Sequence, residues 1–204
     1  MQFKDEILKY ESSNYNNPYI MKIGLLPVII TAPHGVKQKK EDGTIKLSEP
    51  FTKAIAMYVA NNLNTSFLIK TKDTGIDANS DNKEVFKETL LQIIKTQNIK
   101  LLIDLHGSKK ERDFDIEFGT LNNLSADYST VKELEDAFKE HGIKNVIYND
   151  PFKGGGITRY IYGNTDIDVI QIEINRKFRD IDNIDNLKKV CDSLIAFIKQ
   201  YTQD

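Results

Sequence analysis

The sequence predicts an α/β fold in which a mostly parallel or mixed sheet carries helices on both faces. Short apolar runs rich in Val and Ile alternate along the chain with longer segments whose apolar residues recur at helical spacing. The length of 204 residues suits one sizeable domain. Because no repeat or low-complexity linker divides the sequence, residues 1–204 are expected to form a single domain.

The first half of the chain contains four predicted elements. Residues 26–35 are an apolar, β-branched run ending in Pro and Gly, which is typical of a buried strand that enters a loop. Residues 48–63 begin with Ser and Pro and continue at helical spacing, so they predict a helix. Residues 66–70 predict a short strand, and residues 82–97 have the periodicity of an amphipathic helix.

The second half repeats this alternation. The run "KLLIDLHGSKK" (100–110) predicts a buried strand, and the alternating run 113–121 predicts a half-buried one. A helix over 129–142, a Gly-rich loop over 149–163, a strand over 168–176 and a helix over 184–201 follow. In sheets of this kind, ligands bind beyond the carboxyl ends of the strands.

Composition excludes several classes of protein. With 28 basic and 30 acidic side chains, the chain has no bulk positive charge for nucleic acid. The single Cys191 forms no internal disulfide and is expected to be buried in the last helix. No apolar run reaches the ~18 residues of a membrane span, and the first 20 residues lack the apolar core of a signal peptide. We therefore expect a cytoplasmic protein without a membrane or nucleic-acid partner.

Three of the predicted strands end with polar residues of the types used in catalysis and metal binding. His34 follows the first strand, His106 ends the run "LLIDLHG", and Glu173 lies in "VIQIEINR". Each histidine precedes a Gly, which lets a ligand approach the backbone. The third histidine, His141, lies at a predicted helix end, where it is expected to interact with the helix terminus.

Together these residues match a catalytic metal site. Zinc binds neutral imidazoles and carboxylates and keeps one position open for water. Glu173 suits a general base that later protonates the leaving nitrogen. Asp104 shares a strand face with His106, so it is expected to orient that imidazole. The structural alternatives are hydrogen-bonded histidines and a Glu173 paired only with Arg176.

Two further segments bear on substrate binding. Asp77 and Asn79 lie in "TGIDANSDN", shortly after the strand predicted over 66–70. Three consecutive glycines precede Arg159, a combination suited to the wall of a small anionic substrate site. Guanidinium groups such as those of Arg159 and Arg176 bind carboxylates through two parallel hydrogen bonds.

The order "PHG", "DxN", "DLHG", "GGG…TR" and "QIEINR" resembles the N-formylglutamate amidohydrolase family over residues 27–180. The resemblance implies a fold like that of zinc carboxypeptidases and aspartoacylases, one catalytic metal ion and hydrolysis of an amide on an acidic amino-acid derivative. It implies that His34 and His106 are metal ligands and Glu173 the acid/base. Arg159 and Arg176 would face or support the substrate carboxylates, and Asn79 would also bind substrate.

The chain departs from the family pattern at two positions. Lys37 stands where carboxypeptidase-like proteins have a ligating Glu, so Asp77 is the candidate third ligand. Ser80 replaces an arginine expected to bind a carboxylate.

The leading hypothesis is a hydrolase with one divalent metal ion, expected to be Zn²⁺, that cleaves a C–N amide bond of an N-acylated acidic amino acid such as N-formylglutamate. Its partner is a small anionic amide or acylamino acid. One alternative is a metallopeptidase acting on peptides or γ-glutamyl polymers, which an open cleft favours. The other is a non-catalytic binding protein with the same fold, which a Lys37 in the metal position would favour.

Overall fold

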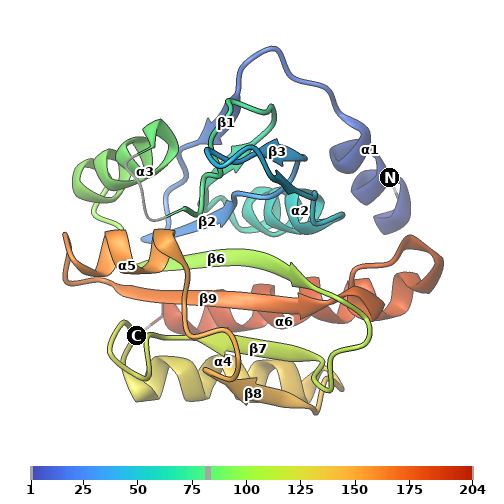
Figure 1. The fold of residues 1–204 in the computed structure, drawn as a ribbon. Coiled ribbons are helices and arrows are strands. Elements are labelled where there is room, and N and C mark those ends of the chain that lie inside the picture. Colours follow the sequence, from blue (N-terminus) through green and yellow to red (C-terminus); the bar gives the residue numbers. More distant parts are fainter. Residues whose placement is uncertain (1, 81–83, 204) are drawn as a thin grey trace.

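A seven-stranded mixed sheet forms the centre of the molecule (Figure 1). The computed structural model describes residues 2–80 and 84–203. The strands of the sheet are β1 (Tyr19–Lys22), β2 (Val28–Ala32), β5 (Ser66–Lys70), β6 (Leu101–Ser108), β7 (Ile116–Gly119), β8 (Val146–Tyr148) and β9 (Asp168–Asn175). Two short strands, β3 (Gln38–Lys39) and β4 (Ile45–Lys46), pair in a separate hairpin.

The strand order is β1-β5-β2-β6-β9-β7-β8. Strands β5, β2, β6 and β9 are parallel, whereas β1 runs antiparallel to β5 at one edge. At the other side β7 runs antiparallel to β9 and pairs in parallel with β8. The predicted α/β class is confirmed, and of the two predicted sheet types the mixed one is present.

Helices cover both faces of the sheet, as predicted (Figure 1). The helices are α1 (Phe3–Ser12), α2 (Thr52–Leu63), α3 (Val85–Thr96), α4 (Tyr128–Glu140), α5 (Gly156–Tyr162) and α6 (Ile184–Tyr201), with 3₁₀ turns η1 (Arg176–Phe178) and η2 (Ile181–Asn183). Helices α1, α2, α4 and α6 contribute to one apolar core and α3 and α5 to the other. Cys191 is fully buried in the first core, as expected.

The helix predicted over 82–97 and the loop predicted over 149–163 differ in extent from the structure. The helix predicted over 82–97 corresponds to α3, but residues 82 and 83 lie outside the described residues. The segment 149–163 is a loop only in its first part, because α5 begins at Gly156. Ile157 and Ile161, four residues apart, pack into the apolar core beneath this helix. Burial of these two side chains thus gives order to a segment that its glycines alone suggest is a loop.

The register of the central strands brings the polar strand ends together. In the parallel pair β6–β9, His106 lies opposite Glu173, and in the pair β2–β6, Thr31 lies opposite Asp104. His34 follows β2 two residues after its end. Since β2, β6 and β9 are neighbours and parallel, these side chains meet at one end of the sheet, where the fold rule places ligand sites.

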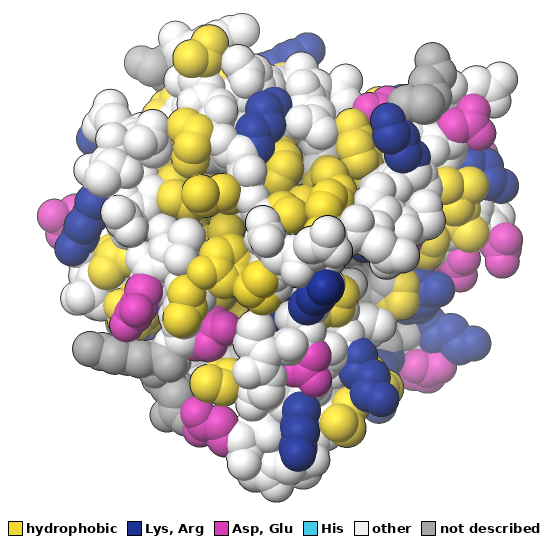
Figure 2. All heavy atoms as spheres, turned by 90° about the horizontal axis from the view of Figure 1, so that it is seen from above, with side chains coloured by type: hydrophobic (Ala, Val, Ile, Leu, Met, Phe, Trp, Pro, Cys, Tyr) yellow, Lys and Arg dark blue, Asp and Glu magenta, His cyan; other side chains and the backbone are white. Residues whose placement is uncertain are grey.

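The β1 edge of the sheet lies on the face shown in Figure 2, where hydrophobic side chains gather among uncharged ones. Met21 and Leu25, on β1 and shortly after it, are exposed. The strand is only four residues long, which limits pairing with another chain. Among the described residues, no helix combines the length and the apolar character needed to cross a bilayer.

Candidate metal and catalytic site

Three buried side chains converge at the end of the central strands. The Nδ1 atoms of His34 and His106 are 3.1 Å apart. The carboxylate of Glu49 spans them, with Oε1 2.9 Å from Nδ1 of His34 and Oε2 3.4 Å from Nδ1 of His106. One donor atom from each residue lies within 4.8 Å of the others, an arrangement that can hold a metal ion. Two imidazoles and one carboxylate are a ligand set typical of catalytic zinc.

An aspartate lies against the outer nitrogen of each imidazole. Asp104 Oδ2 is 3.0 Å from Nε2 of His106, and the hydroxyl of Thr31 donates to Oδ1 of Asp104 at 2.6 Å. Asp77 Oδ1 is 2.7 Å from Nε2 of His34. A carboxylate on Nε2 holds the ring in one orientation and favours the tautomer that leaves Nδ1 free to bind a metal. The predicted contact between Asp104 and His106 is therefore present.

The structure places Glu49, rather than Asp77, beside the two Nδ1 atoms. Glu49 lies just before α2, and Phe51 between them adopts φ = 69°, so the chain turns sharply there. The backbone N–H of Glu49 donates to the carbonyl of His34, and the N–H of Gly107 donates to Oε2 of Glu49 at 2.9 Å. Sequence reasoning missed Glu49 because an acid at a helix start is common and no spacing links it to His34.

The charges of the site favour a cation among these groups. Burial raises the pKa of Glu49, but the charges of His34 and His106 lower it by more. The net result is a pKa well below the ordinary value for Glu. Burial lowers the pKa of His106, but the charges of Asp104 and Glu49 raise it by more. The net result is a pKa well above the ordinary value for His. The same acids that stabilise an imidazolium would stabilise a metal ion bound by the two Nδ1 atoms.

Glu173 lies beside the two histidines in a pocket of about 320 Å³. Its side chain is buried, and Nε2 of Gln171 donates to its Oε1 at 3.0 Å. Burial raises the pKa of Glu173 above its ordinary value; the charge of His106 opposes this shift and that of Glu49 adds to it. A carboxyl group with a raised pKa can accept and return a proton near neutral pH. Within the described residues, Glu173 forms no ion pair with Arg176, which was the structural alternative for this acid.

A second buried acid, Glu117, lies on β7 opposite Glu173. Oε1 of Glu117 accepts from the N–H of Phe152 at 2.6 Å, and Oε2 has no hydrogen-bond partner within the described residues. Burial raises the pKa of Glu117 to about 7, against a lowering by backbone hydrogen bonds. Sequence reasoning treated Glu117 only as part of an alternating strand.

The predicted substrate-binding residues occupy three different places. Asn79 lines the pocket, and its Oδ1 accepts from the N–H of Ile157 at 2.9 Å. Arg159 lies on the exposed side of α5, where its Nη1 donates to the carbonyl of Gly154, and it is not a lining residue of the pocket. Arg176 lines a neighbouring cleft; its guanidinium lies over the ring of Phe51 and donates to the carbonyl of Arg179.

Lys37 and His141 lie apart from this site. Lys37 is exposed and lines neither the pocket nor the neighbouring cleft. Nδ1 of His141 is 2.8 Å from the carbonyl of Ala137 in the last turn of α4, which confirms the predicted interaction with a helix terminus.

Comparison with known proteins supports the predicted resemblance. Residues 85–178 match the family model described as N-formylglutamate amidohydrolase. This range contains Asp104, His106 and Glu173, and the match supports the prediction of an enzyme that hydrolyses amide bonds. A search of curated proteins returned no match.

Solved structures share the fold. An N-formylglutamate amidohydrolase from Ralstonia eutropha JMP134 is 13% identical with a TM-score of 0.71, covering 91% of this chain and 98% of its own. A bacteriophage poly-gamma-glutamate hydrolase is 14% identical with a TM-score of 0.58, covering 93% and 92%. At such low identity these similarities show the fold alone.

Proposed function

We propose that the chain is a single metal-dependent catalytic domain that hydrolyses the amide bond of an N-acylated acidic amino acid such as N-formylglutamate, with zinc as the expected metal. The observation that carries the proposal is the convergence of His34, Glu49 and His106 beside Glu173 in one pocket. The family match over residues 85–178 supports the reaction class.

The donor set fits a divalent metal. Each imidazole has its outer nitrogen against an aspartate and its Nδ1 toward the same space as Glu49. Glu49 already pairs with Lys46 at 2.7 Å. A metal ion bound by the three groups would add a second positive charge beside this buried carboxylate and satisfy both nitrogens. When bound, such a metal supplies Lewis-acid chemistry that activates water and polarises the amide carbonyl. Histidine and carboxylate ligands also bind manganese, iron or cobalt.

Glu173 moves the proton in the proposed reaction. Water adds to the carbonyl carbon, and Glu173 accepts the proton that the water loses. The C–N bond then breaks, and Glu173 returns this proton to the leaving nitrogen. The products are a carboxylic acid and the free amino acid. The raised pKa of Glu173 suits both transfers.

Cationic side chains in the pocket support an anionic substrate. Lys40, Lys46 and Lys153 line it together with Asn79. Lys46 is paired with Glu49, so the charges of Lys40 and Lys153 can attract a substrate carboxylate while the amide lies beside Glu173. In this proposal Asn79, which lines the pocket, binds the substrate directly, and Arg159 and Arg176 contribute from outside the pocket.

Two observations favour catalysis over a binding protein that keeps only the fold. The carboxylate of Glu49 points at the two histidines and is the third candidate ligand. Lys37 is exposed and so does not fill the metal position. The cytoplasmic location stays a prediction.

The test combines metal content with turnover. We expect about one zinc per chain in the purified protein and hydrolysis of N-formylglutamate. His106→Ala should lose the metal and the activity, whereas Glu173→Gln should keep the metal and lose the activity. A wild-type protein that binds no divalent metal even after its addition would overturn the proposal. So would a Glu173→Gln variant with unchanged turnover.

A further inference from the structure

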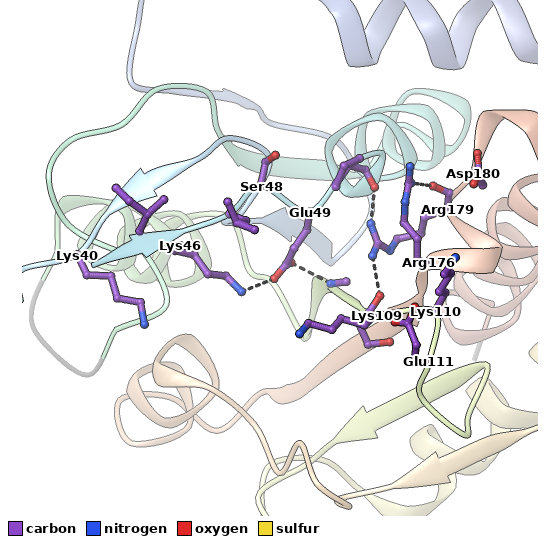
Figure 3. A pocket seen from close by; sticks show the side chains of 15 residues that line it. Lys40, Lys46, Ser48, Glu49, Lys109, Lys110, Glu111, Arg176, Arg179 and Asp180 are labelled. Atoms are coloured by element: carbon purple, nitrogen blue, oxygen red, sulfur yellow. Dashed lines mark hydrogen bonds and ion pairs between the residues drawn. The ribbon is translucent and has the colours of Figure 1, made fainter. Parts of the chain in front are cut away.

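A larger cavity adjoins the catalytic pocket. Its volume is about 680 Å³, and it lies between the β3–β4 hairpin, the segment after β6 and the 3₁₀ turn after β9 (Figure 3). Lys40 and Lys46 line both cavities, and the proposed metal ligand Glu49 lines the larger one. We call the larger cavity the basic cleft; it is continuous with the catalytic pocket along the two shared lysines.

Basic side chains outnumber acidic ones in the basic cleft. The basic residues that line it are Lys40, Lys46, Lys109, Lys110, Arg176 and Arg179. The acidic residues that line it are Glu49, Glu111 and Asp180. In Figure 3, Lys40 and Lys46 extend from the hairpin and Lys109 from the end of β6 toward the same space. Lys46 is paired with Glu49. The other basic residues of the lining, even without the buried Arg179, outnumber Glu111 and Asp180, so the lining keeps an excess of positive charge.

Arg179 is not available to a ligand. It is buried, and its guanidinium donates to the carbonyls of Pro50, Ile174 and Ser108. It therefore forms part of the floor of the basic cleft. Lys109 and Lys110 are exposed, and neither has an ion-pair partner among the described residues.

Uncharged groups complete the lining of the basic cleft. Ile45 and Leu47, exposed by 47% and 71%, provide an apolar rim. Ser108 is buried, and its hydroxyl has no hydrogen-bond partner within the part of the chain that the structure describes. The cleft thus offers cations and an apolar rim that a ligand can contact.

We propose that the basic cleft binds the continuation of an extended acidic peptide, several units of which carry carboxylates, while its scissile amide lies beside Glu173. The inference rests on the proposed amide hydrolysis and names its substrate class. A single acylated amino acid in the catalytic pocket would leave Lys109, Lys110 and Arg176 without a ligand. A chain with a carboxylate on each unit presents repeated charges to repeated cations and the methylene groups of its units to the apolar rim.

Binding of glutamate oligomers tests this inference without turnover. Fluorescent glutamate octamers, one α-linked and one γ-linked, and diglutamate would be titrated into the Glu173→Gln protein by anisotropy. We expect at least one octamer to bind about tenfold or more tightly than diglutamate, since several exposed ion pairs each contribute roughly 0.2–1 kcal/mol. The preference should shrink as salt is raised.

Two double variants locate the binding. Lys109→Gln with Lys110→Gln should weaken octamer binding about fivefold, at the two-pair scale of exposed ion pairs. Lys95→Gln with Lys199→Gln removes the same charge from exposed positions outside the basic cleft and should have little effect. Equal losses in both double variants, or no preference for either octamer, would overturn the inference.

Turnover of N-formylglutamate by the wild-type protein separates the two proposals. If N-formylglutamate is cleaved and neither octamer is preferred, amide hydrolysis stands and the extended substrate is wrong. If an octamer binds through Lys109 and Lys110 but neither it nor N-formylglutamate is cleaved by the wild type, the proposed function fails and the assignment of an acidic ligand to the basic cleft stands.

Discussion

The site has two halves that are built differently. The strand half consists of Asp104, His106 and Glu173, which lie on adjacent parallel strands in register. The loop half consists of His34, Glu49 and Asp77, which lie in connections after β2, before α2 and after β5. Both halves place an aspartate on the outer nitrogen of a histidine, at 3.0 Å for His106 and 2.7 Å for His34.

The two halves keep their geometry by different means. In the strand half, alternation along β6 alone puts Asp104 and His106 on one face. In the loop half, Asp77 lies 43 residues from His34 in the sequence. Each loop side chain therefore needs a hydrogen bond of its own to hold it in position. For Asp77 that anchor is the N–H of Asn79, which donates to Oδ1 of Asp77 at 2.9 Å.

The largest expected effect comes from Glu49, the member of the loop half that touches both histidines. Glu49→Gln keeps the shape and an acceptor for the N–H of Gly107 but removes the charge that favours a cation. We expect metal affinity to fall by more than the about 10–100-fold typical of orienting partners, with loss of hydrolysis. Metal content after dialysis measures this. Full metal retention would mean that Glu49 is not a ligand.

The two aspartates provide a matched pair for the comparison. Asp104→Asn and Asp77→Asn should each lower metal affinity by about 10–100-fold, because each removes the carboxylate that orients an imidazole. Asp104→Asn should have the larger effect, since Asp104 is fully buried and also accepts from Thr31. Competition with a chromogenic chelator gives both affinities. An equal or larger effect of Asp77→Asn would show that the loop half is as strictly built as the strand half.

The smallest expected effect concerns Glu117, next to the strand half, and its dependence on pH. Folding raises the pKa of Glu117 from its ordinary 4.5 to about 7, so the folded state binds the proton more tightly than the unfolded state. Its contribution to the free energy of unfolding is therefore full below about pH 4.5 and lost as pH rises to about 7. Glu117→Gln removes this dependence and should stabilise the protein by about 1–3 kcal/mol at pH 8.

Urea unfolding at pH 5 and pH 8 measures this difference for Glu117. The gain should be much smaller at pH 5 than at pH 8, because Glu117 is mostly protonated in the folded state at pH 5. A variant that is equally destabilised at both pH values would indicate that the carboxylate form is the native one.

Much of the strand half follows from local pattern. The apolar run before Asp104 predicts a buried strand, and the two-residue period places Asp104 beside His106. Glu173 is predicted as a buried acid because it interrupts an apolar run, and the fold rule predicts that the strand ends meet. These inferences need only alternation and strand order.

The remainder depends on contacts between segments far apart in the chain. Glu49 becomes the third candidate ligand because the turn at Phe51 and the bond to the His34 carbonyl direct it inward. Arg159 faces solvent because Ile157 and Ile161 occupy the buried side of α5.

Local sequence pattern is enough to predict the α/β class, the two candidate metal-binding histidines and the buried acid, since strand periodicity and burial are properties of neighbouring residues. Contacts made on folding fix the place of Glu49, the orienting position of Asp77 and the convergence of lysines in the basic cleft. The physical reason is that the direction of a loop side chain depends on hydrogen bonds and packing with distant segments, which no local pattern encodes.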